Sequence, residues 1–191
     1  MTNSLSITVV GAGGIGSAVA FSLARAGFAP KLVARGETLT AIRRNGLHVE
    51  KWDGGGVARL EVTDNPPELG PQDLVIGTMK AQDWPQGLPV LTPLIGPQTA
   101  LLPPINGVPW WYFDGQAGPL RGERIAAVDP EGALLEALPA RSVIGSVVYM
   151  GVARLAPGVV RWTSGNKFVL GEALGARRER SPPCFERAGS M

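Results

Sequence analysis

The stretch that decides the fold is residues 6–27, SITVVGAGGIGSAVAFSLARAG. It contains the pattern G-x-G-x-x-G at Gly11, Gly13 and Gly16, which is typical of loops that bind the pyrophosphate of a dinucleotide. The chain has 26 glycines in 191 residues, so about 0.5 matches to this pattern are expected by chance. The pattern alone therefore does not separate a binding loop from a fortuitous glycine turn.

The flanking sequence favours the binding loop. Residues 7–10 form a short, mainly β-branched apolar run, which predicts a buried strand. Residues 14–26 are mostly small and apolar, and Gly27 stands where a helix C-cap belongs, which predicts a helix. A strand that ends at the first glycine and a helix that opens at the last are the context that a dinucleotide loop requires.

Each glycine of the pattern has a separate predicted role. Gly11 allows the tight turn, Gly13 lets phosphates approach the backbone, and Gly16 lets the helix pack closely on the strand. The phosphates would accept hydrogen bonds from free amides at the helix N-terminus, where the helix dipole favours negative charge. The predicted cofactor-binding loop consists of Gly11, Ala12, Gly13, Gly14, Ile15 and Gly16.

The rest of the chain alternates strand and helix patterns, which predicts an α/β fold: a Rossmann-type, doubly wound, mainly parallel sheet with an added β-hairpin and antiparallel closing strands. Further main strands are expected at 31–34, at 74–76 and before Pro103, a short helix at 37–46, and a turn with a short helix within 129–140. The hairpin is expected to pair 47–52 with 57–62, and the closing strands to turn at 156–158 and 164–166. We expect residues 1–172 to form the domain and 173–191 to be an irregular basic tail.

Composition argues against several classes of protein. The formal charge of +2 and the dispersed basic residues give no support for nucleic-acid binding. Cys184 is the only cysteine and His48 the only histidine, so we expect neither an internal disulfide nor a metal site. The chain shows no export signal and no apolar run of membrane-spanning length. We therefore expect a soluble, cytoplasmic protein without nucleic-acid or membrane partners.

The end of the second strand indicates which dinucleotide binds. An NAD site usually places an acidic residue there for the ribose 2′-hydroxyl, but this strand ends in Ala34 and Arg35. A guanidinium at that point would pair with the 2′-phosphate of NADP, with Arg43 or Arg44 as helpers. A solvated surface arginine is the alternative interpretation.

Several stretches together resemble the ketopantoate reductases (2-dehydropantoate 2-reductases) over roughly residues 5–172. They are "VVGAGGIGS", "LVARG" followed by "RRNGLHVE", "GTMKAQDW", "PPINGVPWWYF" and "PGVVRWTSGNKFVLGE". The resemblance implies hydride transfer from NADPH to the keto carbon of a small 2-oxo acid, giving pantoate on the route to coenzyme A. It also implies that Lys80 lies against the cofactor, that Asn106 contacts cofactor and substrate, and that the strand near Gly151 passes beside the nicotinamide.

Plainer interpretations of these residues remain open. Lys80 alone would be a solvated lysine, and Asn106 followed by glycine would be an ordinary turn. The aromatic run at residues 110–113 is expected to serve core or domain-interface packing. His48 and Cys184 are given no role.

The chain departs from the family after residue 172. Ketopantoate reductases continue into a helical domain that brings the proton-donating lysine and further substrate contacts, so we assign no catalytic residue here. We expect a truncated, weakly active chain whose uncovered face promotes self-association. A non-catalytic NADP-binding module, or a half-enzyme that needs a separate helical domain, is the alternative, and an interaction domain with purely structural glycines is the third.

Overall fold

The computed structural model describes residues 5–114 and 117–172. The tail predicted at 173–191, which includes Cys184, lies outside the described residues.

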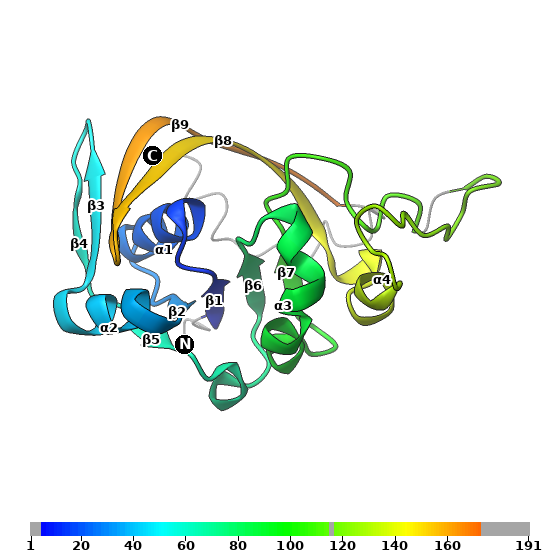
Figure 1. Ribbon diagram of the computed structural model, residues 1–191, viewed down its shortest axis with the longest axis horizontal. Coiled ribbons are helices and arrows are strands. Elements are labelled where there is room, and N and C mark those ends of the chain that lie inside the picture. Colours follow the sequence, from blue (N-terminus) through cyan, green and yellow to red (C-terminus); the bar gives the residue numbers. More distant parts are fainter. Residues whose placement is uncertain (1–4, 115–116, 173–191) are drawn as a thin grey trace.

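A five-stranded sheet forms the centre of the molecule (Figure 1). Its order is β5-β2-β1-β6-β7, and every neighbouring pair is parallel. The predicted parallel Rossmann-type sheet is therefore confirmed. The strands are β1 (Ile7–Val10), β2 (Lys31–Val33), β5 (Glu61–Thr63), β6 (Leu74–Gly77) and β7 (Ala100–Leu102).

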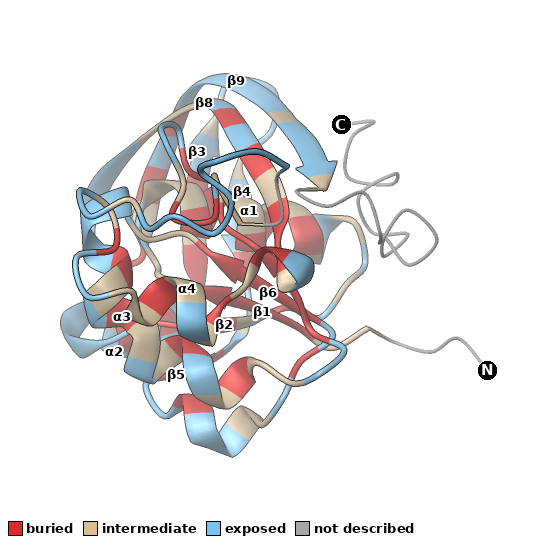
Figure 2. Ribbon diagram, turned by 90° about the vertical axis from the view of Figure 1, so that its right-hand side faces the viewer, coloured by how far each residue is buried: buried red, intermediate tan, exposed pale blue. Residues whose placement is uncertain are grey.

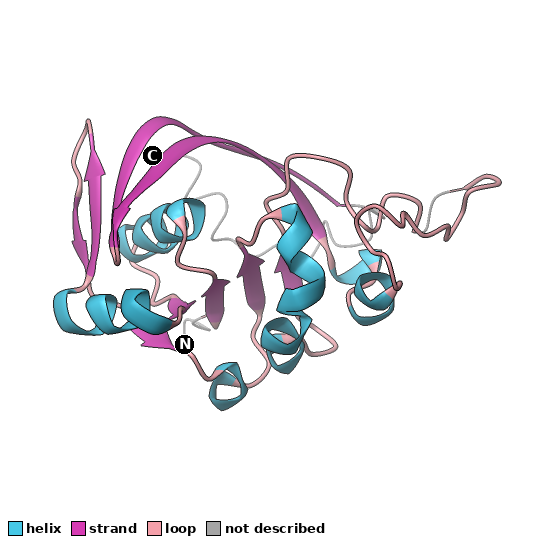
Figure 3. Ribbon diagram, in the orientation of Figure 1, coloured by secondary structure: helices cyan, strands magenta, loops and turns pink. Residues whose placement is uncertain are grey.

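A second sheet of order β4-β3-β9-β8 lies beside the first. Its long strands, β8 (Ile144–Ala156) and β9 (Val159–Glu172), pair antiparallel and arch over α1, as the magenta ribbon of Figure 3 shows. The shorter strands are β3 (Leu47–Lys51) and β4 (Gly56–Ala58). Parallel bridges from Leu101 to Val143 and from Pro104 to Ser146 join the start of β8 to the edge of the main sheet.

Local sequence explains where the two long helices begin and end. Helix α1 (Gly14–Arg25) follows directly on β1 and the glycine loop, as predicted. Helix α2 (Gly36–Asn45) ends at Gly46, whose φ of +82° suits glycine at a helix end. The remaining helices are α3 (Trp84–Leu91), α4 (Ala133–Ala137), and the 3₁₀ turns η1 (Pro66–Leu69), η2 (Ala81–Asp83), η3 (Thr92–Leu94) and η4 (Ala140–Ser142).

The predicted hairpin is only partly right. Strands β3 and β4 do pair antiparallel, but the second arm stops at Ala58. Residues 61–63 instead form β5, which pairs parallel with β2 at the edge of the main sheet. Val62 is 7% exposed and packs in the main core. The free energy gained by this burial exceeds that of further pairing in the hairpin.

The turn predicted at residues 164–166 is wrong, because β9 continues through it. Ser164 pairs with Gly151 and Lys167 pairs with Tyr149, so β9 carries one extra residue at this point. Gly165 takes a φ of +65°, as a β-bulge often requires. The glycine that suggested a turn therefore bends the strand without ending it.

The core has two clusters on either side of the sheet strands, and Figure 2 shows the buried strands in red. Trp110 and Trp111 belong to the second cluster, at 2% and 7% exposure. The Trp110 ring lies 4.7 Å from that of Trp84, and its indole donates to the Leu138 carbonyl oxygen. Packing was the predicted role of these tryptophans, whereas Tyr112 in the same run is exposed.

Candidate functional site

The strand order places a topological switch point between β1 and β6. The chain runs from β1 through β2 to β5 on one side, then crosses back to β6 and β7 on the other. In open parallel sheets, ligands bind at such a switch point, beyond the carboxyl ends of the strands. The glycine loop follows β1 and Thr78 follows β6, so both lie at this point.

The glycine loop is held closed by contacts that leave no space for side chains. A Cβ on Gly16 would lie 1.9 Å from the Gly11 carbonyl oxygen and 2.4 Å from Thr78 Oγ1. Gly11 has a φ of +102°, and its amide donates to the Val33 carbonyl oxygen at 3.0 Å. Glycine at positions 11 and 16 is thus a steric requirement of this turn.

Gly13 stands at the open side of the loop. It precedes α1 as an extended N-cap, with φ −76° and ψ −168°, and a Cβ there would meet no described atom within 4 Å. The first-turn amides of a helix lack intrahelical acceptors, so this end of α1 can offer donors to an anion. The first turn also contains no acidic side chain that would oppose an anion.

Strand β8 crosses the N-terminus of α1. A Cβ on Gly14 would lie 2.7 Å from the Val152 carbonyl oxygen, so this close crossing requires glycine there. A Cβ on the neighbouring Gly151 would lie 2.5 Å from Ser164 Oγ and 2.8 Å from Thr163 Oγ1. Gly151 is the chain neighbour of Val152 and therefore lies close to this crossing.

Arg35 lies just beyond β2, at the N-cap of α2. Its backbone is extended, with φ −138° and ψ 162°, and its side chain is exposed. Neighbouring Ala34 is fixed by an amide hydrogen bond to the Thr63 carbonyl oxygen at 3.0 Å. Arg35 is therefore on the same edge of the sheet as the glycine loop, because both follow adjacent parallel strands.

The two proposed helpers of Arg35 lie elsewhere. Arg43 is eight residues further along α2, about 12 Å at 1.5 Å per residue. Its Nε donates to the Val62 carbonyl oxygen and its guanidinium pairs with Asp64 at 4.0 Å. Arg44 lines a separate pocket at the far end of α2. The structure does not bring either residue to Arg35.

Lys80 and Asn106 follow β6 and β7 at the same edge. Lys80 is exposed, two residues after Thr78. The Asn106 amide donates from Nδ2 to the Val148 carbonyl oxygen and accepts from the Val148 amide, both at 2.9 Å. Asn106 thus fixes β8 in place, and its side chain keeps one further donor hydrogen and one lone pair for a ligand.

Two contributors to the site are absent from the sequence-based prediction. Thr78 supports the glycine loop through its hydroxyl, 2.9 Å from both the Val10 and Gly11 carbonyl oxygens. The sequence signal that could have revealed Thr78 is a polar residue directly after a predicted central strand. Val152 meets Gly14 through the long-range arch of β8, which no local pattern reveals.

Among residues 5–114 and 117–172, no three acidic, histidine or cysteine side chains are grouped as metal ligands would be. No helix in the same described ranges is long and apolar enough to span a bilayer.

A parallel sheet with a glycine-rich strand-to-helix turn at its switch point defines a Rossmann-type α/β domain, the class that commonly holds dinucleotides. Residues 7–175 match the family described as ketopantoate reductase PanE/ApbA, and the chain belongs to this family.

Individual relatives agree with this assignment. The 2-dehydropantoate 2-reductase of Mesorhizobium japonicum is 44% identical over 177 residues, which cover 92% of this chain and 54% of that protein. The enzyme of the same name from Halobacterium salinarum is 30% identical, over 91% of this chain and 51% of that protein. A crystal structure from Ralstonia solanacearum MolK2, assigned to the ketopantoate reductases, superposes with a TM-score of 0.88 at 38% identity, over 96% of this chain and 58% of that one. The chain thus spans about half the length of the curated relatives it matches.

Proposed function

We propose that this chain binds NADPH at the glycine loop and supplies the cofactor half of a 2-oxo acid reductase, with 2-dehydropantoate as substrate and pantoate as product. The observation that carries the proposal is the open N-terminus of α1 at Gly13, set at the topological switch point of the sheet. The named relatives support the choice of reaction.

The cofactor would be held by groups along one edge of the sheet. Amides of the loop formed by residues 11–16 would donate to the pyrophosphate, and the Arg35 guanidinium would pair with the 2′-phosphate. NADPH supplies the hydride that reduces the keto carbon. Lys80 and Asn106, with Gly151 nearby, would border the nicotinamide and the substrate, and Asn106 would offer its remaining donor to a substrate oxygen.

The reduction also needs a proton for the forming alkoxide. We assign no residue of this chain to that step. The described half would therefore bind and orient the cofactor and the substrate, and we expect turnover by the chain alone to be weak. In the alternative, the chain is a non-catalytic NADP-binding module.

A second observation favours NADH as a competitor. Glu37 lies in the first turn of α2, two residues after Arg35. A carboxylate at that position accepts hydrogen bonds from a ribose 2′-hydroxyl and repels a 2′-phosphate. The balance between Arg35 and Glu37 sets the preference, and we expect the guanidinium to dominate.

The test is a titration of the purified chain with NADPH and, in parallel, NADH, followed by tryptophan fluorescence and calorimetry. We expect saturable binding that is tighter for NADPH and lost in Gly13→Val, whose side chain would project into the phosphate position. Equal binding to Gly13→Val and the parent would refute the glycine-loop site. Measurable reduction of 2-dehydropantoate by the chain would refute the non-catalytic alternative.

A further inference from the structure

A cavity of about 390 Å³ lies at the end of α2 that is farthest from Arg35. It is lined by the end of α2, the start of β3, the residue after β4 and the turn between β8 and β9. Helix α2 and strands β3 and β4 lie together at the left of Figure 1. None of the loop residues 11–16, all of which the structure describes, lines this cavity, so it is separate from the proposed cofactor site.

The side chains that can carry charge in this cavity are all basic. They are Arg44 in the last turn of α2, His48 in β3 and Arg59 just after β4. No acidic side chain from the described part of the chain lines the cavity. At least two positive charges therefore share one hollow, because arginine stays protonated at neutral pH.

The two arginines have no counter-charge within the protein. Neither Arg44 nor Arg59 forms an ion pair with any described residue. By contrast, Arg161 on the neighbouring β9 pairs with Glu50 at 2.7 Å. Like charges that are gathered in one place repel each other and destabilise the compact state. An anion bound between the two guanidinium groups would remove this repulsion.

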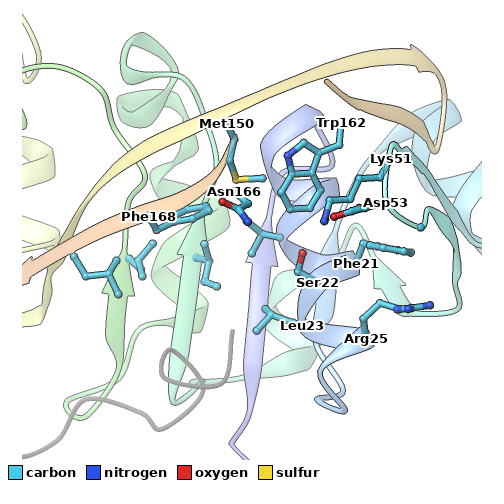
Figure 4. Close-up of a pocket in the computed structure, with 15 residues that line it drawn as sticks. Phe21, Ser22, Leu23, Arg25, Lys51, Asp53, Met150, Trp162, Asn166 and Phe168 are labelled. Atoms are coloured by element: carbon cyan, nitrogen blue, oxygen red, sulfur yellow. The ribbon is translucent and has the colours of Figure 1, made fainter. Parts of the chain in front are cut away.

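Another cavity, beside α1 and under β8 and β9, shows a different arrangement of charge (Figure 4). Lys51 in that cavity pairs with Asp53 at 3.0 Å, so this charge is balanced within the chain. Arg25 lines the same cavity as a single exposed arginine. The cavity at the end of α2 differs because it combines two arginines with no carboxylate among the described residues.

The helix dipole accounts for only one of the two arginines. Arg44 lies in the last turn of α2, where a positive charge stabilises the negative end of the dipole. Arg59 lies between β4 and β5 and belongs to no helix. Its position in the same cavity therefore needs another explanation.

Close approaches of the backbone hold the cavity in shape. Gly158 has a φ of +73°, and a Cβ there would lie 3.0 Å from Ile42 Cγ1. A Cβ on Gly46 would lie 2.6 Å from Val57 Cγ1. The His48 amide also donates to the Gly158 carbonyl oxygen at 2.9 Å. The segments that carry the basic side chains are thus fixed relative to one another before any ligand binds.

We propose that this cavity binds a phosphate dianion between Arg44 and Arg59, either free or as the phosphoryl group of a small molecule. A planar guanidinium group donates two parallel hydrogen bonds to phosphate oxygens, and two such groups match both charges of the dianion. A monocarboxylate would leave one arginine charge unmatched. His48 Nε2 lies 3.2 Å from the Asn45 carbonyl oxygen, which orients the imidazole at the border of the site. The proposal does not depend on cofactor binding.

Nuclear magnetic resonance on the full 191-residue chain provides the test, with sodium phosphate added at constant ionic strength. We expect saturable shifts of the backbone amides of Arg44, His48, Arg59 and Gly158. The amides of residues 11–16 report separately on phosphate at the glycine loop. Glycerol 3-phosphate in a parallel titration distinguishes a phosphate ester from free phosphate, and tighter binding of either one identifies the source. Acetate should bind more weakly than both, and equal affinity for acetate would overturn the choice of a dianion.

Matched variants locate the site. Arg59→Gln and Arg44→Gln each remove one guanidinium group, and we expect each to weaken phosphate by about tenfold or more, as for other hydrogen bonds between charged groups. Arg25→Gln is the control, because it also removes an exposed arginine from the last turn of a helix beside a cavity. It should leave phosphate binding unchanged. Circular dichroism would check the fold of all three variants, and equal effects in the three would overturn the proposal.

A titration with phosphate in the presence of saturating NADPH separates this proposal from the proposed function. We expect the cavity to bind phosphate with the same affinity as without the cofactor. Loss of phosphate binding under NADPH would make the cavity part of the cofactor site and would overturn the proposal. Absence of any phosphate-dependent shift at the cavity would also overturn it. Failure of NADPH to bind would count against the proposed function and leave the phosphate result valid.

Discussion

The hydroxyl of Thr78 lies 2.9 Å from the carbonyl oxygen of Gly11, and it joins the end of β6 to the glycine loop after β1. The same hydroxyl is 2.9 Å from the Val10 carbonyl oxygen, so its one hydrogen serves two acceptors. The Thr78 amide also donates to Val10. The loop is thus shaped from across the switch point, by a residue on the neighbouring strand.

Thr78→Val tests this support. Valine keeps the side-chain volume but cannot donate, so the two carbonyl oxygens lose a hydrogen bond worth about 1 kcal/mol. We expect a lower melting temperature and weaker NADPH binding. Thr78→Ser keeps the donor and should retain most of the affinity. Parent-like stability and affinity in the valine variant would show that the hydroxyl does not support the loop.

Gly16 and Gly13 give a pair of substitutions with opposite expectations. Gly16→Ala places a methyl group 1.9 Å from the Gly11 carbonyl oxygen, so the loop must open at a cost of at least about 1–3 kcal/mol. Gly13→Ala places the same group in open space at an ordinary φ. Thermal unfolding should separate the two variants clearly. A Gly16→Ala chain as stable as Gly13→Ala would contradict the packing seen around the loop.

The sequence was most informative where one local signal decided the structure. The strand, glycine loop and helix of residues 7–25 were predicted because hydrophobic pattern and glycine spacing agree there. The end of α2 at Gly46 was predicted for the same kind of reason. The prediction for the second arm of the hairpin was wrong because the alternating pattern around Val62 suits a strand in either sheet. Burial against residues far away in the sequence decides which sheet the strand joins.

The candidate site shows the same limit. Arg35 could be proposed from the sequence because it lies just beyond a predicted parallel strand, and such strands end at one edge of the sheet. Lys80 was proposed from the resemblance to the ketopantoate reductases. The contact between Gly14 and Val152 could not be proposed, because it depends on the curvature of a strand about 138 residues away in the chain. Asn106 was also proposed from this resemblance, and its bonds to Val148 depend on the same strand as Val152 and were not anticipated.

Asn106→Ala should destabilise the chain as well as impair function. It removes the partner of both the amide and the carbonyl of Val148, a buried residue, at a cost of about 1–3 kcal/mol. Asn106→Asp keeps only the acceptor and places a carboxylate against the Val148 carbonyl oxygen, so it should not restore stability. Chemical denaturation would measure both. An alanine variant with unchanged stability would assign Asn106 to ligand contact alone.

Arg35→Gln tests the choice of cofactor. Glutamine is polar but uncharged, so it loses the charge-assisted contact with the 2′-phosphate, worth about 1.5–3 kcal/mol. NADPH should therefore bind roughly 10- to 100-fold more weakly, while NADH, which lacks that phosphate, should bind as in the parent. Arg44→Gln is the matched control, because Arg44 lies in the last turn of α2, at the opposite end of the helix from Arg35, where it lines a pocket. Calorimetric titration of both cofactors into all three proteins provides the measurement. Equal losses of NADPH affinity in the two variants would show that only the net charge of the chain matters. An unchanged NADPH affinity in Arg35→Gln would show that Arg35 does not contact the 2′-phosphate, and Glu37 would then set the cofactor preference.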